Sequence, residues 1–361
     1  MTHHATSGPA DALEEYLRAR REHLVVIEHG FGAATGRGTT VRIWRRGKLA
    51  QTRRLAWSSR VPGPFTWLKD VVLSLTAPVW SRGRVDEFIG VDSLNAAAGL
   101  VLARARLAGR VVFWTIDYAP RRFENGILNR MYLWLDRCCV EQCAETWNLS
   151  PRMEEGRRAR GVVGPQRVVP MGATARRPRI PSHPHRLVHM GSLLEKQGVQ
   201  VGIRALPLVL PRVPDVSLLV IGDGPFRPAL EALTRELGLE GAVEFTGYVD
   251  DHDEVVDLIA ASGVALATYD PQLADFTTYA DPGKIKAYLA AGVPVVATDV
   301  PWSAEWLASR GAGVVVAYEP EDVAKAVRLL FEDANARTAA ARLGAENDWS
   351  RIFDAAFVTA R

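Results

Sequence analysis

The segment from Asp281 to Lys284 combines residue types that suit a phosphate-binding helix start. Asp281 can cap a helix, Pro282 fits the first helical position because it lacks an N–H, and Gly283 lets a ligand approach the backbone. Lys284 adds a positive charge beside the free N–H groups and the positive end of the helix dipole. These residues predict an anion site. The alternative is a capped surface helix that leads into a strand.

Three predicted strands with glycine-containing ends would position this helix. The first ends at Gly191, and Lys196 follows five residues later, so that both would face one crevice. The second leads from the apolar run at 218–221 into the glycines of 222–225, and the third covers 243–248. The carboxyl ends of parallel strands meet at one edge of a sheet, where ligands bind. The pattern therefore predicts an open parallel sheet whose carboxyl edge binds a phosphorylated ligand.

The amino-terminal half also reads as alternating strands and helices. A first strand at 24–27 opens into a glycine-rich loop that contains Gly30 and Gly32. Such a loop would let an anionic ligand approach the backbone. The alternative is a hairpin-type connection to a strand at 41–44.

Asp117 stands at the end of a buried-looking strand at 111–116, where α/β folds place cleft residues. It is therefore the best catalytic candidate among the carboxylates. Arg121 and Arg122 follow it, and guanidinium groups pair bidentately with phosphate and carboxylate. The alternative is that this aspartate and the two arginines only cap the next helix.

Length and composition agree with two domains. With 361 residues, of which 48% are hydrophobic, the chain exceeds a typical single-core domain and can bury two sheets. No apolar run is long enough to span a bilayer, and the polar start lacks a secretory signal, so a cytoplasmic location is expected. The three cysteines, at 138, 139 and 143, are expected to be reduced packing residues, and no metal site is predicted.

Charge is unevenly distributed, although the net charge is only +3. Residues 1–170 hold 26 Lys and Arg against 16 Asp and Glu, whereas the remainder holds 18 against 25. Within the basic half, the apolar and aromatic residues at 65–80 have Arg60, Arg82 and Arg84 beside them and would suit a helix at an anionic membrane surface. The alternative is a helix buried under the sheet. No nucleic-acid module is recognisable, so nucleic acid is not an expected partner.

The carboxy-terminal motifs resemble those of GT-B glycosyltransferases, especially the large retaining group, glycosyltransferase family 4-like, that uses nucleotide-diphosphate sugars. The resemblance rests on MGSLLEKQG, VIGDGP, VEFTGYV and PGKIKAYLAAGVPVVAT in the expected order. It implies an α/β fold of GT-B architecture, in which two Rossmann-like domains with parallel sheets face each other across a cleft. Residues 1–170 would form the acceptor domain, residues 171–345 the nucleotide-sugar donor domain, and residues 346–361 a helix that crosses back to the first domain.

The resemblance also implies a donor site in the carboxy-terminal domain. Gly191, Lys196 and Lys284 would hold the diphosphate, while the glycine-rich exit at 222–225 would lie by the nucleotide. The set expected at the donor is Gly191, Ser192, Gly222, Gly224, Tyr248, Thr277, Thr278, Tyr279, Asp281, Gly283 and Tyr288. No cofactor is implied, because the nucleotide-diphosphate sugar is a co-substrate.

Two departures from the family pattern affect this site. Ser192 stands where the family often has Arg. Tyr279 and Ala287 stand where it often has two glutamates, the second of which usually binds ribose. Asp281 and the threonines at 277–278 are left as substitute polar groups near the sugar.

The resemblance favours a retaining, metal-independent transfer of a sugar to a hydroxyl acceptor, such as a glycan, a glycolipid or a small molecule. The catalytic candidates are Asp117, Lys284 and Lys196. Asp117 would be the general base of an inverting reaction and would orient the acceptor or the donor sugar in a retaining one. The residues expected at the acceptor side of the cleft are Gly30, Gly32, Arg121, Arg122 and Ser150. With the basic first domain, a lipid-linked acceptor and peripheral contact with the inner face of the membrane are expected.

Two other functions stay open at this point. A nucleotide-sugar 2-epimerase of the same fold would consume a sugar nucleotide without an acceptor. A catalytically degenerate partner subunit would account for the departures at Ser192 and Ala287. A dinucleotide dehydrogenase is disfavoured, because no Gly-x-Gly-x-x-Gly turn follows the first strand.

Overall fold

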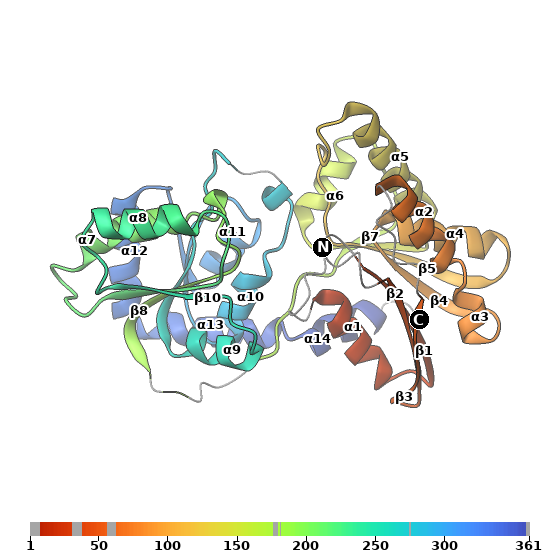
Figure 1. Ribbon diagram of the computed structural model, residues 1–361, viewed down its shortest axis with the longest axis horizontal. Helices are drawn as coiled ribbons and strands as arrows, with labels where there is room; N and C mark the ends of the chain where they lie inside the picture. Colours follow the sequence, from red (N-terminus) through yellow and green to blue (C-terminus); the bar gives the residue numbers. More distant parts are fainter. Residues whose placement is uncertain are drawn as a thin grey trace. The chain divides into compact units, whose positions relative to one another are not determined.

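The structure is a computed structural model that describes residues 8–30, 38–55, 63–175, 180, 182–273 and 276–358. The chain divides into two compact units, Met1–Pro170 with Ala356–Arg361, and Met171–Ala355 (Figure 1). Gly32 and Arg60 lie outside the described residues. Within the described part of the chain, no helix is both long enough and apolar enough to cross a bilayer.

The first unit begins with a helix and an antiparallel sheet, namely α1 (Pro9–Arg18), β1 (His23–His29), β2 (Thr39–Arg45) and β3 (Lys48–Leu55). The expected strand–helix alternation is therefore wrong here, and the hairpin alternative is correct. The Gly30 N–H donates to the Gly38 carbonyl at 3.1 Å, which extends the pairing of β1 with β2. Arg46 and Gly47, with φ of 47° and 76°, form the two-residue turn between β2 and β3.

The rest of the first unit is a parallel sheet of β4 (Val85–Val91), β5 (Ala108–Thr115), β6 (Glu145–Asn148) and β7 (Gln166–Val168), in that order. Its helices are α2 (Gly63–Ser74), α3 (Ala77–Ser81), α4 (Ser93–Arg104), α5 (Gly126–Gln142) and α6 (Pro151–Arg158). Val111 and Phe113 of β5 pack with Ala96 of α4 and Cys139 of α5 in one core. Cys139 is fully buried and burial raises the pKa of its thiol, as for a packing residue.

The second unit is a parallel sheet of six strands in the order β10-β9-β8-β11-β12-β13. The strands are β8 (His183–Met190), β9 (Ser217–Ile221), β10 (Val243–Gly247), β11 (Ser262–Ala267), β12 (Val295–Thr298) and β13 (Gly313–Val316). Counted from β8, this is the strand order 3-2-1-4-5-6 of a nucleotide-binding doubly wound sheet. The order reverses between β8 and β11, so the switch point of the sheet lies at the carboxyl ends of these two strands.

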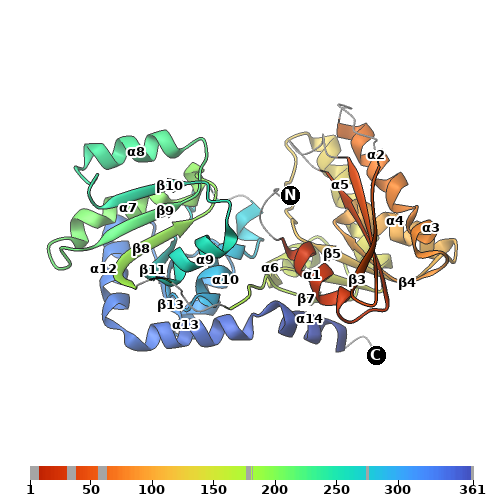
Figure 2. The same ribbon diagram turned by 60° about the horizontal axis from the view of Figure 1, so that its bottom comes forward.

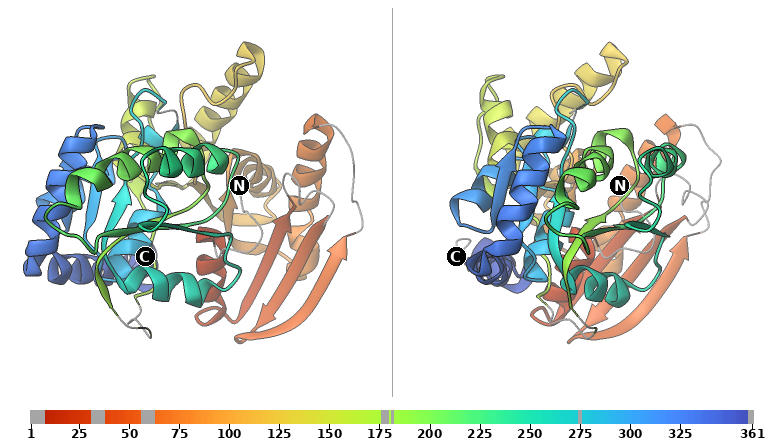
Figure 3. Two further views of the ribbon diagram at one scale, coloured as in Figure 1. Left: turned by 60° about the vertical axis from the view of Figure 1, so that its left-hand side comes forward. Right: turned by 90° about the vertical axis from the view of Figure 1, so that its left-hand side faces the viewer.

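Helices cover both faces of this sheet (Figure 2 and Figure 3). Leu187 and Leu218 pack on one face with α7 (Val199–Val209), α8 (Arg227–Glu236) and α12 (Pro320–Glu332). Their neighbours Val188 and Leu219 pack on the other face with α9 (His252–Ala260), α10 (Gly283–Ala290), α11 (Ser303–Ser309) and α13 (Ala334–Glu346). Successive side chains of a strand point to opposite faces, which is why Leu187 and Val188, like Leu218 and Leu219, are both apolar. Helix α14 (Trp349–Val358) ends the described chain.

Candidate active site

Two glycine-containing loops lock together at the carboxyl edge of the second sheet. Gly191 follows β8 with φ of +135°, and Gly222 follows β9 with φ of +129°, which L side chains rarely adopt. The Gly191 N–H donates to the Ile221 carbonyl at 2.9 Å. A Cβ atom at Gly222 would lie 2.1 Å from the Gly191 carbonyl oxygen. Both positions therefore need glycine, and they leave bare backbone at the predicted edge.

Lys284 extends from α10 to this edge. Its Nζ donates to Oε1 of Gln197 at 2.6 Å and lies 3.5 Å from Nε2 of His189. The same Nζ lies 5.0 Å from the centroid of the Tyr269 ring, and a Cβ atom on Gly191 would be 3.4 Å from it. The ammonium group thus lies at the end of β8, beside the segment that follows β11, at the switch point of the sheet.

The surroundings of the Lys284 ammonium are electrically neutral. Burial, together with the nearby ammonium, holds the pKa of His189 well below its usual value, so the imidazole is neutral. Burial also lowers the pKa of Lys284 to about 7. No carboxylate among the described residues lies within ion-pair distance of the Lys284 Nζ. Even a half-buried cation is costly without negative charge nearby, so this arrangement suits an anionic ligand.

The predicted cap at Asp281 is wrong. Helix α10 begins at Gly283, with Pro282 at the N-cap and no capping hydrogen bond from a side chain. The Asp281 carboxylate instead accepts a hydrogen bond from the Met171 N–H at 2.8 Å and lies 3.5 Å from the Nζ of Lys286. Both side chains of this ion pair are fully buried. The buried lysine needs a counter-ion, and that demand outweighs a cap at the helix start.

The other donor candidates in strands and helices differ in exposure. Tyr288 is buried, and its hydroxyl accepts a hydrogen bond from the Met190 N–H at 2.8 Å, so it fastens α10 to the end of β8. Ser192 and Tyr248 are exposed after β8 and β10. Gly224 follows β9, and its N–H is bonded to the Asp223 carboxylate.

The remaining donor candidates lie on short 3-10 turns and the loops beside them. Lys196 is half-buried in the turn η2 (Glu195–Gln197), and its carbonyl accepts a hydrogen bond from the Asp270 N–H at 3.1 Å. Thr277 is buried in the turn η3 (Phe276–Thr278), while Thr278 and Tyr279 are half-buried. The contacts of Gly191, Gly222, Lys284 and Tyr288 meet at the switch point.

Two side chains that contact Lys284 were missed by sequence reasoning. Gln197 is adjacent to the predicted Lys196, and spacing alone cannot tell which of two neighbours points toward the lysine. His189 is fully buried near the end of β8. A histidine between the apolar residues Val188 and Met190 was the available signal, but it could not reveal a partner 95 residues away in the sequence.

In the first unit, Asp117 follows β5 and is partly exposed. Arg122 donates to the Asp117 carbonyl at 2.9 Å and lies 3.7 Å from its carboxylate. The Tyr132 hydroxyl donates to the same carbonyl at 3.3 Å. The capping alternative is wrong, because Asn125 caps α5 with its own side chain. Arg121 is exposed.

Two other acceptor candidates have local structural roles. Gly30 continues the β1–β2 hairpin through its bond to Gly38. Ser150 is fully buried and caps α6, where its hydroxyl accepts a hydrogen bond from the Met153 N–H at 3.3 Å. These contacts do not by themselves favour a role in acceptor binding.

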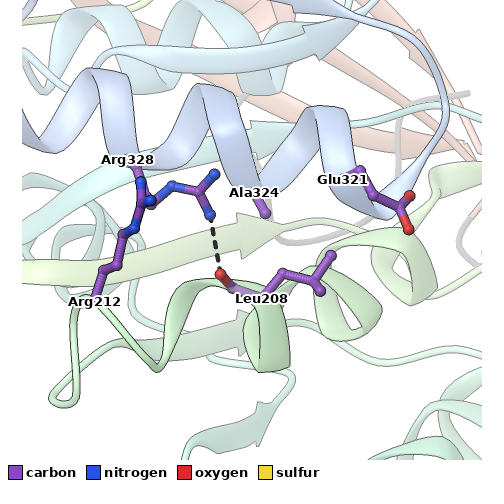
Figure 4. A pocket seen from close by; sticks show the side chains of 5 residues that line it. All are labelled: Leu208, Arg212, Glu321, Ala324 and Arg328. Carbon is purple, nitrogen blue, oxygen red and sulfur yellow. Dashed lines mark hydrogen bonds between the residues drawn. The ribbon is translucent and has the colours of Figure 1, made fainter.

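A shallow pocket on the second unit lies apart from all predicted site residues. It is lined by five residues of the α7 and α12 regions, namely Leu208, Arg212, Glu321, Ala324 and Arg328 (Figure 4). Arg328 donates to the Leu208 carbonyl at 2.9 Å across it. As for metals, no three His, Cys, Asp or Glu side chains gather into a possible site within the described ranges.

The match to a protein-family model lies within the second unit. The family model for glycosyl transferases group 1 matches residues 184–333. A GDP-mannose-dependent alpha-(1-6)-phosphatidylinositol dimannoside mannosyltransferase of Mycobacterium tuberculosis is 28% identical over 174 residues, which are 46% of this chain and 41% of that protein. The lipopolysaccharide core biosynthesis glycosyltransferase LpsE of Rhizobium meliloti is 29% identical over 162 residues, which are 44% of this chain and 43% of that protein. The matches thus span about two fifths of these relatives.

Solved structures resemble more of the chain. Anabaena HepE in complex with UDP has a TM-score of 0.65 at 18% identity, over 81% of this chain and 82% of that chain. OtsA without ligand has a TM-score of 0.67 at 14% identity, over 100% of this chain and 97% of that chain. These likenesses establish the fold alone, and the family-model match covers about two fifths of the chain. The chain therefore has the fold of the GT-B glycosyltransferases, and its residues 184–333 match the family model for glycosyl transferases group 1.

Proposed function

We propose that the protein transfers a sugar from a nucleotide-diphosphate sugar to a hydroxyl acceptor. The observation that carries this proposal is the ammonium of Lys284, which lies among neutral groups at the switch point of the sheet, on a half-buried side chain. A diphosphate would supply the missing negative charge there. The printed names of relatives and neighbours, which include a GDP-mannose-dependent enzyme and a UDP complex, support the nucleotide-sugar class. No observation favours the epimerase or the non-catalytic alternative.

The proposed chemistry exchanges one C–O bond for another. The bond between the anomeric carbon and the diphosphate oxygen breaks, a bond from that carbon to the acceptor oxygen forms, and the hydroxyl proton leaves. Lys284 offsets the charge that develops on the departing diphosphate, with Lys196 as a second cation. We expect a retaining outcome, in which Asp117 orients a sugar rather than attacking it. Proton NMR of the product's anomeric centre checks this, because an inverted centre would make Asp117 the general base.

Metal independence is a further part of the proposal. A lysine ammonium and backbone N–H groups at a helix start can neutralise a diphosphate without a divalent cation. Turnover should therefore be unchanged by EDTA. Loss of turnover in EDTA that Mg²⁺ or Mn²⁺ restores would contradict this part of the proposal.

We propose that the acceptor is linked to a lipid and is met at the inner face of the membrane. Two helices of the basic first unit carry exposed apolar residues at helical spacing, namely Phe65, Leu68 and Val72 on α2, and Ile127, Met131 and Trp134 on α5. Trp67 of α2 lies near Phe123 of the loop before α5, with ring centroids 6.4 Å apart. Exposed apolar side chains beside arginines suit an anionic bilayer. We expect the protein to sediment with phosphatidylglycerol vesicles but not with phosphatidylcholine vesicles. Failure to sediment with either kind of vesicle would contradict this contact.

Thermal shift with UDP, GDP and their sugar conjugates tests the donor class. A ligand that binds only the folded state raises the melting temperature. Without added metal, we expect ligands of one base to raise the melting temperature clearly. For that base, the nucleoside diphosphate should raise it and the nucleoside should not. No shift with any member of either series, at millimolar concentration, would overturn the proposed function.

A further inference from the structure

The side chain that contacts the Lys284 ammonium most closely is Gln197, whose Oε1 accepts its hydrogen bond at 2.6 Å. We propose that Gln197 is a positioning residue, which holds this ammonium toward the donor diphosphate while leaving its charge uncompensated. This inference rests on the proposed function. It adds a residue from a different element, the turn η2, to the recognition of the donor.

An amide suits this task because it accepts a hydrogen bond without carrying charge. A carboxylate at the same place would form an ion pair with Lys284 and repel a phosphate. The second acceptor near Lys284, Nε2 of His189, is likewise neutral. An ammonium has three N–H donors, so bonds to these two acceptors leave at least one for a ligand.

The backbone around Gln197 is fixed at both ends. The Gln197 N–H donates to the Leu194 carbonyl at 2.9 Å within the turn. On the other side, the Thr268 hydroxyl donates to the Gly198 carbonyl at 2.8 Å. A Cβ atom on Gly198 would lie 1.5 Å from the Thr268 carbonyl oxygen, so the turn lies directly against the end of β11. The amide of Gln197 is therefore carried on a rigid support.

The charge state of the site follows from the groups that face Lys284. These are His189 on β8 and Tyr269 after β11, and burial keeps both neutral near pH 7. Burial also keeps Tyr288, one turn further along α10, neutral. Burial lowers the pKa of Lys284 to about 7, and a bound diphosphate would raise it again. A carboxylate in place of the Gln197 amide would also raise the pKa of Lys284, even when no ligand is bound. The pH dependence of diphosphate binding should therefore differ between the protein with the Gln197 amide and the variant with a carboxylate at this position.

Calorimetric titration with UDP and GDP between pH 6 and pH 9 tests the inference on the full chain. Gln197→Met keeps the length of the side chain but removes the acceptor, and we expect binding about tenfold weaker, as for one lost hydrogen bond to a charged group. Gln197→Glu keeps an acceptor but adds charge, and we expect binding about 100-fold weaker at pH 7. In Gln197→Glu, the decline of diphosphate binding with rising pH should also occur at higher pH. Gln272→Met changes an exposed glutamine and serves as the matched control.

The outcomes separate the inference from the proposed function. If the unchanged protein binds neither UDP nor GDP, or if Lys284→Met binds them equally well, the proposed function fails and the inference with it. If Lys284→Met abolishes binding while both Gln197 variants bind as the unchanged protein does, with the same pH dependence, only the inference is overturned. A melting temperature of each variant shows that its fold is intact, and Gln197→Glu provides the decisive comparison even if Gln197→Met is unstable.

Discussion

Lys284 and Lys286 are two residues apart on α10, and their ammonium groups lie in opposite electrostatic surroundings. Lys286 is fully buried with the Asp281 carboxylate 3.5 Å away, and its Nζ lies 4.0 Å from the centroid of the Trp306 ring. Lys284 has an amide and a neutral imidazole instead. Positions two apart on a helix point in different directions, so one helix supplies both environments.

This difference separates a structural cation from a ligand-binding one. Lys286 meets its counter-ion within the fold, and that counter-ion also holds the Met171 N–H at the start of the second unit. Lys284 has its positive charge directed to an edge of bare glycine backbone. A charge left without a partner in the folded protein marks a place where a ligand completes the electrostatics.

The largest effect is expected at the structural lysine. Lys286→Met leaves the Asp281 carboxylate buried without its cation, and we expect the free energy of unfolding to fall by about 3 kcal/mol. Urea denaturation measures this. A loss below about 0.5 kcal/mol, the level of an ordinary surface change, would show that the buried pair does not hold the unit together.

The matched change at Lys284 should affect turnover rather than stability. Lys284→Met removes a charge that has no partner in the fold, so the free energy of unfolding should stay the same or rise. Turnover should fall by about 100-fold, as for loss of one preorganised charge contact. Turnover measured with saturating donor checks the expected loss of activity. Urea denaturation of the same preparation checks the expected stability. Full activity in this variant would remove Lys284 from the donor site.

The pH dependence of stability should sharpen the contrast. Because the pKa of Lys284 is about 7 in the folded protein and near 10.5 when unfolded, the unfolded chain binds more protons between these values. The contribution of Lys284 to the free energy of unfolding should therefore rise with pH from about 7 to about 10.5, while diphosphate affinity falls. This contribution is measured as the difference in the free energy of unfolding between the unchanged protein and Lys284→Met across this pH range. A flat difference would mean that Lys284 is solvated.

The smallest effect is expected at an ion pair within α8. Glu231 forms a half-buried i,i+4 pair with Arg227 there. Glu231→Ala should leave turnover unchanged and alter the free energy of unfolding by less than about 0.5 kcal/mol. Loss of turnover comparable to that of Lys284→Met would show that the assay reports folding rather than the site.

The sequence predicted the parallel sheet of the second unit because its determinants are local. Apolar runs that end in glycine identify β8 and β9, and Gly191 and Gly222 do meet at one edge. Lys284 was found because it follows Gly283 in a helix start. These features need only neighbours in the sequence.

The errors arose where distant partners decide the outcome. Asp281 has the residue type of a cap, but Lys286 and the Met171 backbone draw it into the interior. The period-two pattern of β2 is typical of an antiparallel sheet with one solvated face, whereas the apolar run of β1 lacks it and reads as a buried parallel strand. Gln197 was missed because spacing does not fix the direction of a side chain in a turn.

The most direct test of the central claim is the number of protons taken up when a nucleoside diphosphate binds. Calorimetric titration with UDP or GDP at pH 8, in buffers of different ionisation enthalpy, measures this number when the phosphate itself, with a second pKa of about 6, is already ionised. Because Lys284 is mostly neutral at that pH, its recharging by the ligand predicts an uptake approaching one proton, which is absent in Lys284→Met. Binding without proton uptake, or the same uptake in the variant, would contradict the assignment of Lys284 as the cation that receives the diphosphate.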